Sequence, residues 1–311
     1  MKIIYAGAPE FSIAPLNSII NAGFNVVAVI TQPDKPVGRK GVITPTPLKV
    51  FAEQKGIKVF TFEKIRQSVS EIIEIGADLM ITCAYGQLLT QEVLNAFPLG
   101  VFNIHASLLP KYRGAAPIAA SVIHGESQTG VTVMKTDIGL DTGDMLLKRS
   151  VEISKDDTAG TLSEKLSSLG ASAIVDALNL IKSGNAVYEK QENSLATLVK
   201  KIKKEHALCD FSTSSEQLSC FIRGMNPAPV AYSYLNGKAV NFFFAKVADF
   251  DCEGQIGEVV RADKTGVYVK TGNGVLNIVE MQLEGGKRMR AVDLVNGRKI
   301  SVGMRFEREK V

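Results

Sequence analysis

Short apolar and β-branched runs alternate with helical patterns through the first two thirds of this chain, and this alternation restricts the possible folds more than any other feature. A buried strand is predicted at 2–6, a helix at 11–21 and a second strand at 25–31. Further strands are predicted at 58–60, 78–83, 101–105, 129–136 and 144–153. Strands that alternate with helices build mostly parallel sheets with helices on both faces. We therefore predict an α/β domain of the Rossmann-like kind.

The pattern changes after a long helix. Thr161 and Glu164 have the spacing of a capping box, which predicts that this helix starts at Thr161 and ends near Gly184. A polar stretch with a lysine cluster follows, and then strands are predicted at 230–235, 239–247, 254–261, 266–270 and 274–283. Five short strands with glycine turns indicate a small β-barrel of the oligonucleotide-binding (OB) kind. We predict an α/β domain at 1–189, a linker at 190–208 and a C-terminal β-barrel domain at 209–311.

Composition agrees with two domains, since 311 residues exceed one typical domain. A net charge of +4 permits an anionic partner without requiring one. The four cysteines form no CxxC pair, so we expect neither a disulfide framework nor a metal site. The apolar N-terminal stretch is too short for a signal peptide, and no later run approaches a membrane span, so we expect a cytoplasmic protein. We also expect it to be a monomer.

The densest chemical signal follows the strand at 101–105. Asn103 and His105 are two residues apart on a strand, so their side chains share one face, at the end where open α/β sheets place ligands. An amide donor beside an imidazole suits a reaction that builds negative charge on oxygen. The alternative interpretation is a strand-end turn with a structural histidine. The Gly/Pro-rich loop at 108–117 favours the functional interpretation, because such loops are often functional.

A second signal is the acidic loop at 137–144. Its two glycines suggest a backbone that passes close to a ligand, and Asp141 or Asp144 can pair with His105 and orient its ring. A turn-forming acidic loop is the alternative, and calcium is disfavoured because the spacing does not match an EF-hand. The turn after the first strand lacks a G-x-G-x-x-G fingerprint, and Ser107 lacks the nucleophile elbow of a serine hydrolase.

These motifs together resemble the folate-dependent formyltransferases. The matching residues are Asn103-Ile-His105, Ser107-Leu-Leu-Pro110, Arg113-Gly-Ala-Ala-Pro117 and Asp141-Thr-Gly-Asp144. The similarity also includes the opening segment to Phe11, the segment at 84–86 and Asn226-Pro-x-Pro229, so that it covers nearly the whole chain. The loop at 31–39 and the second domain indicate the members of this family that act on initiator methionyl-tRNA.

The resemblance implies roles for particular residues. It implies that Asn103, His105 and Asp141 are the catalytic trio. It implies that the co-substrate 10-formyltetrahydrofolate is bound by Tyr85, Gly86, Ser107, Leu108, Leu109 and Pro110. The 31–39 loop would reach the tRNA acceptor arm, and Lys35, Arg39 and Lys40 offer phosphate contacts. Without the resemblance, that loop would be taken for a solvated basic turn. Further candidates for phosphate contacts are Lys200, Lys201, Lys203, Lys204, Arg223, Lys287, Arg288 and Arg290.

The sequence departs from the family pattern at three positions. Ala8 stands where the family usually has Thr, while Tyr112 and Ala228 stand where relatives often have Trp. The trio is unchanged, so the expected reaction type is unaffected, whereas the details of tRNA packing near Ala228 are open. Sugar-nucleotide and glycinamide ribonucleotide formyltransferases share the trio and are the alternatives within the family. A tRNA-binding module with an inactive catalytic core is the alternative from another class.

Overall fold

The computed structural model describes residues 1–38 and 40–309 and divides the chain into two compact units. Unit 1 contains residues 1–117, 128–152 and 163–199, and unit 2 contains residues 118–127 and 153–162 and the chain from residue 200 onward. The three-part division predicted at 189 and 208 stays a prediction. Among the described residues, no helix combines the length and the apolar character that crossing a bilayer requires.

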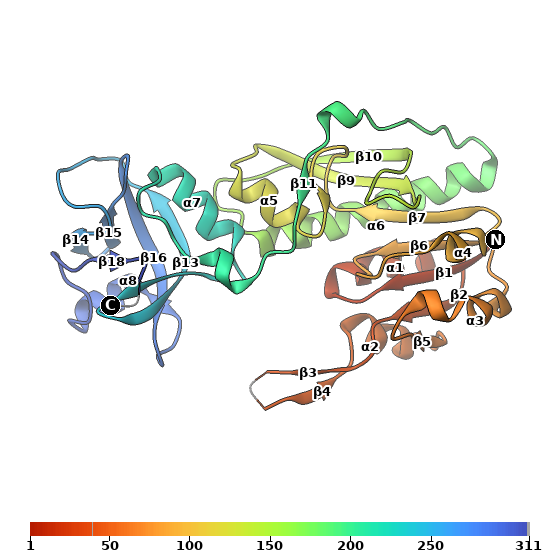
Figure 1. The fold of residues 1–311 in the computed structure, drawn as a ribbon, viewed down its shortest axis with the longest axis horizontal. Coiled ribbons are helices and arrows are strands. Elements are labelled where there is room, and N and C mark those ends of the chain that lie inside the picture. Colours follow the sequence, from red (N-terminus) through yellow and green to blue (C-terminus); the bar gives the residue numbers. More distant parts are fainter. Residues whose placement is uncertain (39, 310–311) are drawn as a thin grey trace. The chain divides into compact units, whose positions relative to one another are not determined.

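A seven-stranded sheet forms the centre of unit 1 (Figure 1). Its strands in spatial order are β5 (Val59–Thr61), β2 (Asn25–Thr31), β1 (Lys2–Gly7), β6 (Leu79–Cys83), β7 (Gly100–His105), β9 (Gln128–Lys135) and β10 (Met145–Glu152). The five strands from β5 to β7 pair in parallel, and β9 and β10 extend the sheet antiparallel. The predicted Rossmann-like, mostly parallel sheet is therefore confirmed.

Helices cover both faces of this sheet. They are α1 (Ile13–Asn21), α2 (Pro47–Gln54), α3 (Val69–Ile75), α4 (Gln91–Asn95) and α6 (Ala159–Ser183). The neighbouring residues Ile3 and Ile4 point to opposite faces of β1, and both are 0% exposed. Strands that are buried on both faces are continuous hydrophobic runs, which is why β1 and β6 show no apolar–polar alternation.

The strand order of unit 1 reverses between β1 and β6, since β2 and β5 follow β1 on one side while β7 follows β6 on the other. Open α/β sheets bind ligands outside the carboxyl ends of their strands at such a reversal. Thr82 near the end of β6 lies in register with Asn103 near the end of β7. The topology therefore brings the loops after β1, β6 and β7 to one edge of the sheet.

Two small strand pairs complete unit 1. The first is a hairpin of β3 (Lys35–Val37) and β4 (Val42–Thr44), which extends away from the main sheet (Figure 1). The second joins β8 (Arg113–Gly114) in parallel to β11 (Leu198–Val199). This pairing attaches the segment after α6 to the loop that follows β7. Short 3-10 turns lie at Glu10–Ser12, Ile65–Gln67 and Asn193–Leu195.

Unit 2 contains a curled antiparallel sheet that forms a half-barrel of the predicted OB-like kind. Its strands are β14 (Val259–Asp263), β15 (Gly266–Lys270), β16 (Val275–Leu283), β13 (Lys238–Val247), β12 (Ala231–Leu235) and β18 (Phe306–Glu307), with β17 (Met289–Arg290) beside β16. Helices α7 (Ser215–Gly224) and α8 (Ala291–Asn296) lie in this unit, as do nearly all of α5 (Pro117–Ile123) and the first turn of α6, and a 3-10 turn spans Lys204–Ala207.

The predicted starts of three elements are wrong: the helix predicted at 11–21 begins at Ile13, after a 3-10 turn, and α6 and β14 also begin elsewhere. Helix α6 begins at Ala159, because Thr158 and Thr161 exchange backbone-to-hydroxyl hydrogen bonds of 3.0 and 3.2 Å. Thr158 therefore caps the helix, and Thr161 is its third residue rather than its cap. The strand predicted at 254–261 begins only at Val259. Gly257 has a φ of +84°, which turns the chain and interrupts the extended backbone immediately before that strand.

The core of unit 2 contains a cluster of three phenylalanines. Phe242 on β13 is 0% exposed and meets the rings of Phe211 and Phe306 edge to face, at centroid distances of 6.1 and 5.2 Å. Large aromatic side chains contribute much of the buried apolar area of a small domain, and edge-to-face pairs add to that contribution.

We expect Phe242→Ala to destabilise unit 2 strongly. A phenylalanine-to-alanine change in a packed core lowers the free energy of unfolding by about 3–5 kcal/mol, because a cavity is left behind. Urea denaturation followed by circular dichroism measures this loss. Phe244→Ala on the same strand is the matched control, since Phe244 is only half-buried, and its loss should be clearly smaller. Equal losses for the two variants would contradict this account of the core.

Candidate active site

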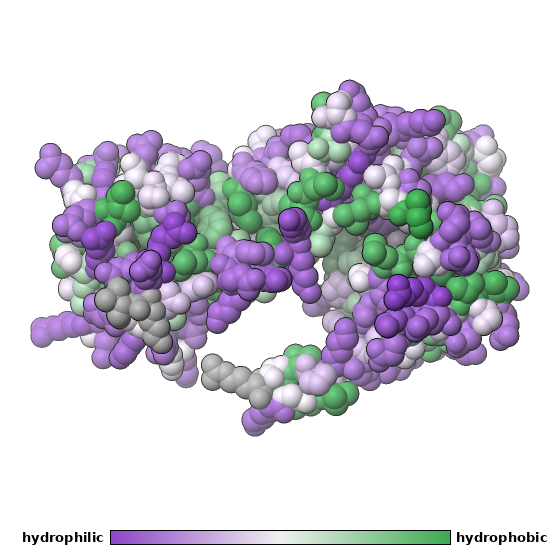
Figure 2. Space-filling model, viewed as in Figure 1, coloured by the Kyte–Doolittle hydropathy of each residue, from purple (hydrophilic) through white to green (hydrophobic). Residues whose placement is uncertain are grey.

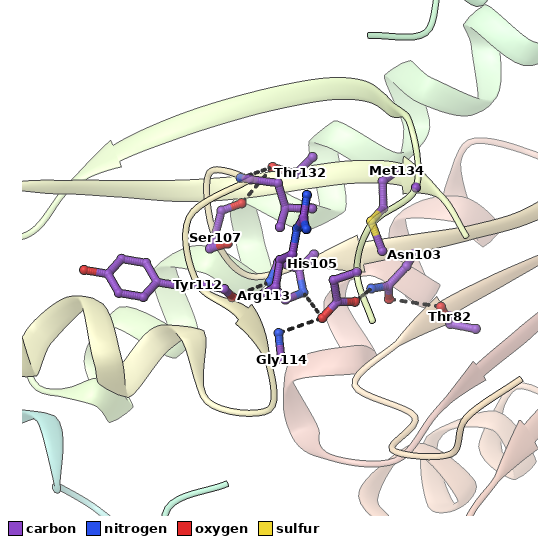
Figure 3. A network of polar contacts seen from close by, with 12 residues as sticks. Thr82, Asn103, His105, Ser107, Tyr112, Arg113, Gly114, Thr132 and Met134 are labelled. Atoms are coloured by element: carbon purple, nitrogen blue, oxygen red, sulfur yellow. Dashed lines mark hydrogen bonds and ion pairs between the residues drawn. The ribbon is translucent and has the colours of Figure 1, made fainter. Parts of the chain in front are cut away.

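The carboxyl end of β7 carries a network of polar side chains (Figure 3). Asn103 and His105 both lie on this strand, as predicted, and the acidic loop after β9 brings Asp141 next to them. The Asp141 Oδ1 atom is 3.4 Å from Asn103 Nδ2, and its Oδ2 atom is 3.6 Å from His105 Nδ1. The structure therefore brings the three predicted residues together, and it places Asp141 rather than Asp144 beside the histidine.

His105 is held at both ring nitrogens. Its Nε2 atom lies 2.9 Å from the carbonyl oxygen of Tyr112, and this nitrogen donates because a carbonyl oxygen can only accept. Its Nδ1 atom faces the carboxylate of Asp141, which forms an ion pair when the ring is protonated. The histidine side chain is 6% exposed and that of Asp141 is 15% exposed, so water screens this pair only weakly. The ring therefore sits between two oxygen acceptors in a largely buried place.

Asn103 is oriented by the neighbouring strand. The hydroxyl of Thr82 on β6 donates to Asn103 Oδ1 at 3.0 Å (Figure 3). The amide nitrogen therefore faces the side of Asp141. A primary amide carries two N–H groups. In the described part of the chain, Asp141 accepts one of them, at a long distance. The second N–H can serve an oxygen atom of a ligand.

Asp141 is held by backbone as well as by side chains. The N–H of Gly114 on β8 donates to its Oδ2 atom at 2.8 Å. Gly114 has a φ of +110°, and a Cβ atom there would overlap the carbonyl oxygen of Val199 on β11. Only glycine combines that conformation with the close approach of β11. The glycine of the Arg113-Gly-Ala-Ala-Pro117 motif therefore supplies the backbone donor for the carboxylate.

The 107–110 segment is mostly turned inward. Ser107 is 0% exposed and donates its hydroxyl to the carbonyl of Lys111 at 2.6 Å. Leu109 is 2% exposed and packs with Met134 and Met145. Leu108 and Pro110 are partly exposed at the surface of the loop. Thr132 on β9 fixes the loop, since its hydroxyl donates to the Ser107 carbonyl at 2.7 Å and accepts from Leu109 N at 3.1 Å.

Tyr85 and Gly86 lie in the loop after β6, at the same edge of the sheet. The ring of Tyr85 is 4% exposed, and burial raises the pKa of its hydroxyl above the usual value. The Tyr85 carbonyl accepts from Gln32 Nε2 at 2.9 Å, which ties this loop to the end of β2. Gly86 is exposed beside it. Gly86 therefore lies at the edge outside the strand ends, where the topology predicts a ligand, whereas the ring of Tyr85 packs into the core beneath it.

The basic loop predicted to contact tRNA includes the β3–β4 hairpin. Lys35 lies on β3, Lys40 lies in the turn, and both are exposed, whereas Arg39 lies outside the described residues. The hairpin also exposes apolar side chains, which Figure 2 shows on its surface: Val37 is 57%, Val42 is 60% and Ile43 is 63% exposed. Exposed apolar residues between lysines are unusual for a merely solvated turn and are typical of a contact surface.

The basic residues of unit 2 differ in their availability. Arg223 is only 8% exposed and donates to the Asp157 carbonyl at 2.7 Å, so its prediction as a surface phosphate contact is wrong. It is buried because α7 packs it into the interior of the unit. Arg288 is paired with Glu280, and Arg290 lies 3.6 Å from Asp293. The exposed lysines of the 200–204 cluster include Lys200, Lys203 and Lys204.

Several residues of this site are not among those predicted. Gln191 and Thr197 come from the polar stretch after α6, and Arg113 is almost completely buried between them and the loop after β7. Arg113 belongs to the motif of the family resemblance, but its role there follows only from the structure. The polar stretch has no periodic pattern, so the sequence does not reveal that Gln191 contacts Asp141, 50 residues earlier.

The arrangement can stabilise an oxyanion and move a proton. An amide donor, an imidazole and a carboxylate meet at a strand end, where a reacting oxygen can approach the free N–H of Asn103. Within the described residues, no group of three or more His, Cys, Asp or Glu side chains is arranged to hold a metal ion.

Comparisons with known proteins agree with this geometry. Residues 1–178 match the formyl transferase family, and residues 201–299 match the formyl transferase C-terminal domain. A methionyl-tRNA formyltransferase of Ruminiclostridium cellulolyticum is 44% identical over 307 residues, which are 97% of this chain and 98% of that protein.

Solved structures show the same fold at low identity. An N-formyltransferase from Helicobacter canadensis superposes with a TM-score of 0.69 at 20% identity, over 93% of this chain and 100% of that one. HypX from Aquifex aeolicus superposes with a TM-score of 0.67 at 16% identity over 95% of this chain, which spans only 48% of HypX. With both of its domains matched and a close full-length relative, the chain belongs to the formyl transferase family.

Proposed function

We propose that this chain transfers the formyl group of 10-formyltetrahydrofolate to the α-amino group of methionine on initiator methionyl-tRNA, a step in translation initiation. The observation that carries the proposal is the 44% identity to a methionyl-tRNA formyltransferase, which extends through both domains. The solved relative from Helicobacter canadensis was crystallised with folinic acid, a formylated folate, which supports a folate donor. We further propose that the protein works as a monomer in the cytoplasm.

In the proposed reaction, the neutral amine attacks the formyl carbon and the carbonyl oxygen becomes an oxyanion. An α-amine has a pKa of about 7.7–8.0, so part of it is neutral at physiological pH. The free N–H of Asn103 donates to the oxyanion. In this scheme His105 acts in its protonated form, held between the Tyr112 carbonyl and the Asp141 carboxylate, and places positive charge beside the oxyanion.

The tetrahedral intermediate then collapses, and the bond between the formyl carbon and the folate nitrogen breaks. The amine loses one proton and the departing nitrogen gains one, so the reaction needs a proton relay but no external acid or base. We assign this relay to Asp141 through a water molecule. Much of the acceleration would come from holding amine and formyl donor side by side.

The proposed acceptor depends on contacts outside the trio. The trio alone fits any amine acceptor, including a sugar nucleotide or glycinamide ribonucleotide. Lys35, Arg39 and Lys40 would contact phosphates of the acceptor arm, and the apolar side chains at Val37 and Val42 would pack against nucleotide surface. The lysines of the 200–204 cluster would add sequence-independent phosphate contacts.

The direct test incubates the protein with 10-formyltetrahydrofolate and charged initiator tRNA and detects formylmethionine. Parallel reactions contain glycinamide ribonucleotide or an amino-sugar nucleotide as the acceptor. We expect formylation of the methionyl-tRNA alone. Product with either of the other acceptors, or no product at all, would refute the proposed acceptor.

We expect His105→Ala to lower kcat by at least about 10²-fold and Asn103→Ala to lower it by about 10²–10³-fold, because each removes charge stabilisation from the transition state. The measurement is steady-state formylation at saturating concentrations of both substrates. His124→Ala is the matched control, since His124 is an exposed histidine at the end of α5, and it should retain full activity. Full turnover by His105→Ala would contradict the proposed mechanism.

We expect the affinity for tRNA to fall steeply with salt, and Lys35→Ala and Lys40→Ala each to reduce the slope of log K against log salt by about 1. The measurement is tRNA binding between about 50 and 200 mM salt. Lys64→Ala is the control, because Lys64 is an exposed lysine that does not belong to the hairpin. Unchanged slopes for both hairpin variants would mean that these lysines are only solvated.

A further inference from the structure

The segment that follows α6 crosses the candidate active site. We propose that Gln191 and Thr197 in this segment are positioning residues that hold Asp141 and His105 in their reactive arrangement. The inference rests on the proposed function, because it concerns the residues assigned to that reaction. It adds to the catalytic trio a part of the chain that the sequence identifies only by its polar composition.

Gln191 makes contacts in two directions. Its Nε2 atom donates to the carbonyl oxygens of Asp141 and Gly143, each at 2.8 Å. Its Oε1 atom accepts from Arg113 Nε at 2.9 Å. Arg113 is 6% exposed, and its Nη2 atom donates to Asn193 Oδ1 at 2.9 Å. The glutamine therefore joins the acidic loop to a buried guanidinium that is itself fixed by the same segment.

The backbone of Asp141 requires such support. Its φ of +53° lies in the left-handed region, which costs free energy for a residue with a side chain. That conformation directs the carboxylate toward His105 and Asn103 while the carbonyl is turned to Gln191. Without a donor at the carbonyl, the loop is expected to relax and move the carboxylate away.

Thr197 supports His105 indirectly, through the backbone of Tyr112. The N–H of Tyr112 donates to Thr197 Oγ1 at 2.7 Å, and Tyr112 has a left-handed φ of +60°. The carbonyl of that same Tyr112 accepts from His105 Nε2. The backbone pairing of β8 with β11 continues this attachment, since Arg113 N donates to the Thr197 carbonyl at 2.8 Å. One short segment therefore holds both loops that contact the histidine ring: the acidic loop at Asp141 and the loop after β7 at Tyr112.

Only a neutral amide satisfies all the partners of Gln191. A carboxylate could accept from Arg113, but its oxygens would face the two carbonyls and lie near Asp141. An ammonium group could donate to the carbonyls but would repel the guanidinium. The donor and acceptor functions of the glutamine can therefore be separated by substitution, which allows a specific test.

The test compares Gln191→Glu and Gln191→Leu with wild type across a range of pH. The quantities to be measured are kcat and the KM values for 10-formyltetrahydrofolate and for charged initiator tRNA. At pH 8 we expect kcat to fall by roughly 10- to 100-fold, because a displacement of about 1 Å at the reacting groups has effects of this size. Both KM values should stay within about threefold of wild type, since substrate binding is not removed. Gln128→Glu, at an exposed position at the start of β9, is the matched control and should behave as wild type.

The pH profile distinguishes positioning from a general structural role. As the pH falls, the carboxyl introduced by Gln191→Glu becomes protonated and can donate to one carbonyl again. The activity of this variant relative to wild type should therefore rise toward low pH, whereas that of Gln191→Leu should not. A ratio independent of pH, or kcat values within about threefold of wild type for both variants, would overturn the role of Gln191.

Thr197 supplies an independent pair. Thr197→Val removes the acceptor for Tyr112 N with little change of shape and should lower kcat, whereas Thr197→Ser keeps the hydroxyl and should restore it. Equal activity of these two variants would overturn the role of Thr197. If wild type itself formylates nothing, the proposed function fails instead. Thermal unfolding of each variant shows whether it is folded, and the Val/Ser pair remains informative if a Gln191 variant is not.

Discussion

The carboxylate of Asp141 is the acceptor on which the geometry of this site depends. It faces the ring of His105 and the amide of Asn103 from β7, and it accepts the N–H of Gly114 from the following loop. The carboxylate can occupy this place only because its own backbone adopts a left-handed conformation. Such a conformation is stable only where surrounding contacts determine it, and here they come from the polar segment after α6.

The polar groups around this carboxylate are largely buried and hydrogen-bonded. The hydroxyl of Thr132 donates to the Ser107 carbonyl, that of Ser107 donates to the Lys111 carbonyl, and the Tyr112 carbonyl accepts from His105. The loop after β7 therefore has a fixed shape. A preorganised donor costs no reorganisation when charge develops in the reaction. The less constrained groups are the second N–H of Asn103 and the exposed loop at Gly86, both at the edge where the strand order reverses.

The parts of this structure that were predicted from the residues alone, without the resemblance, are mainly those with a periodic pattern. The alternation of strands and helices predicted a mostly parallel α/β sheet. The two-residue spacing of Asn103 and His105 predicted that both side chains lie on one face of β7. From the residues of the acidic loop alone, Asp141 and Asp144 were equivalent candidates; the resemblance named Asp141, and the structure places Asp141 beside His105. The cap of α6 was misplaced for a similar reason, since Thr158 and Thr161 both offer a suitable hydroxyl. Gln191 left no signal at all, because its partners are distant in sequence.

The reaction type and the choice of acceptor depend on different parts of the molecule. The trio and its supports lie within unit 1 and suit any formyl transfer to an amine, and relatives that share this fold at about one-fifth identity include sugar N-formyltransferases. We propose that the elements that distinguish the acceptor include the β3–β4 hairpin, whose apolar residues remain exposed beside lysines. A hairpin that is attached to the sheet by few contacts can change its sequence without disturbing the carboxylate network. Acceptor choice can therefore diverge within the family while the chemistry of the strand end stays the same.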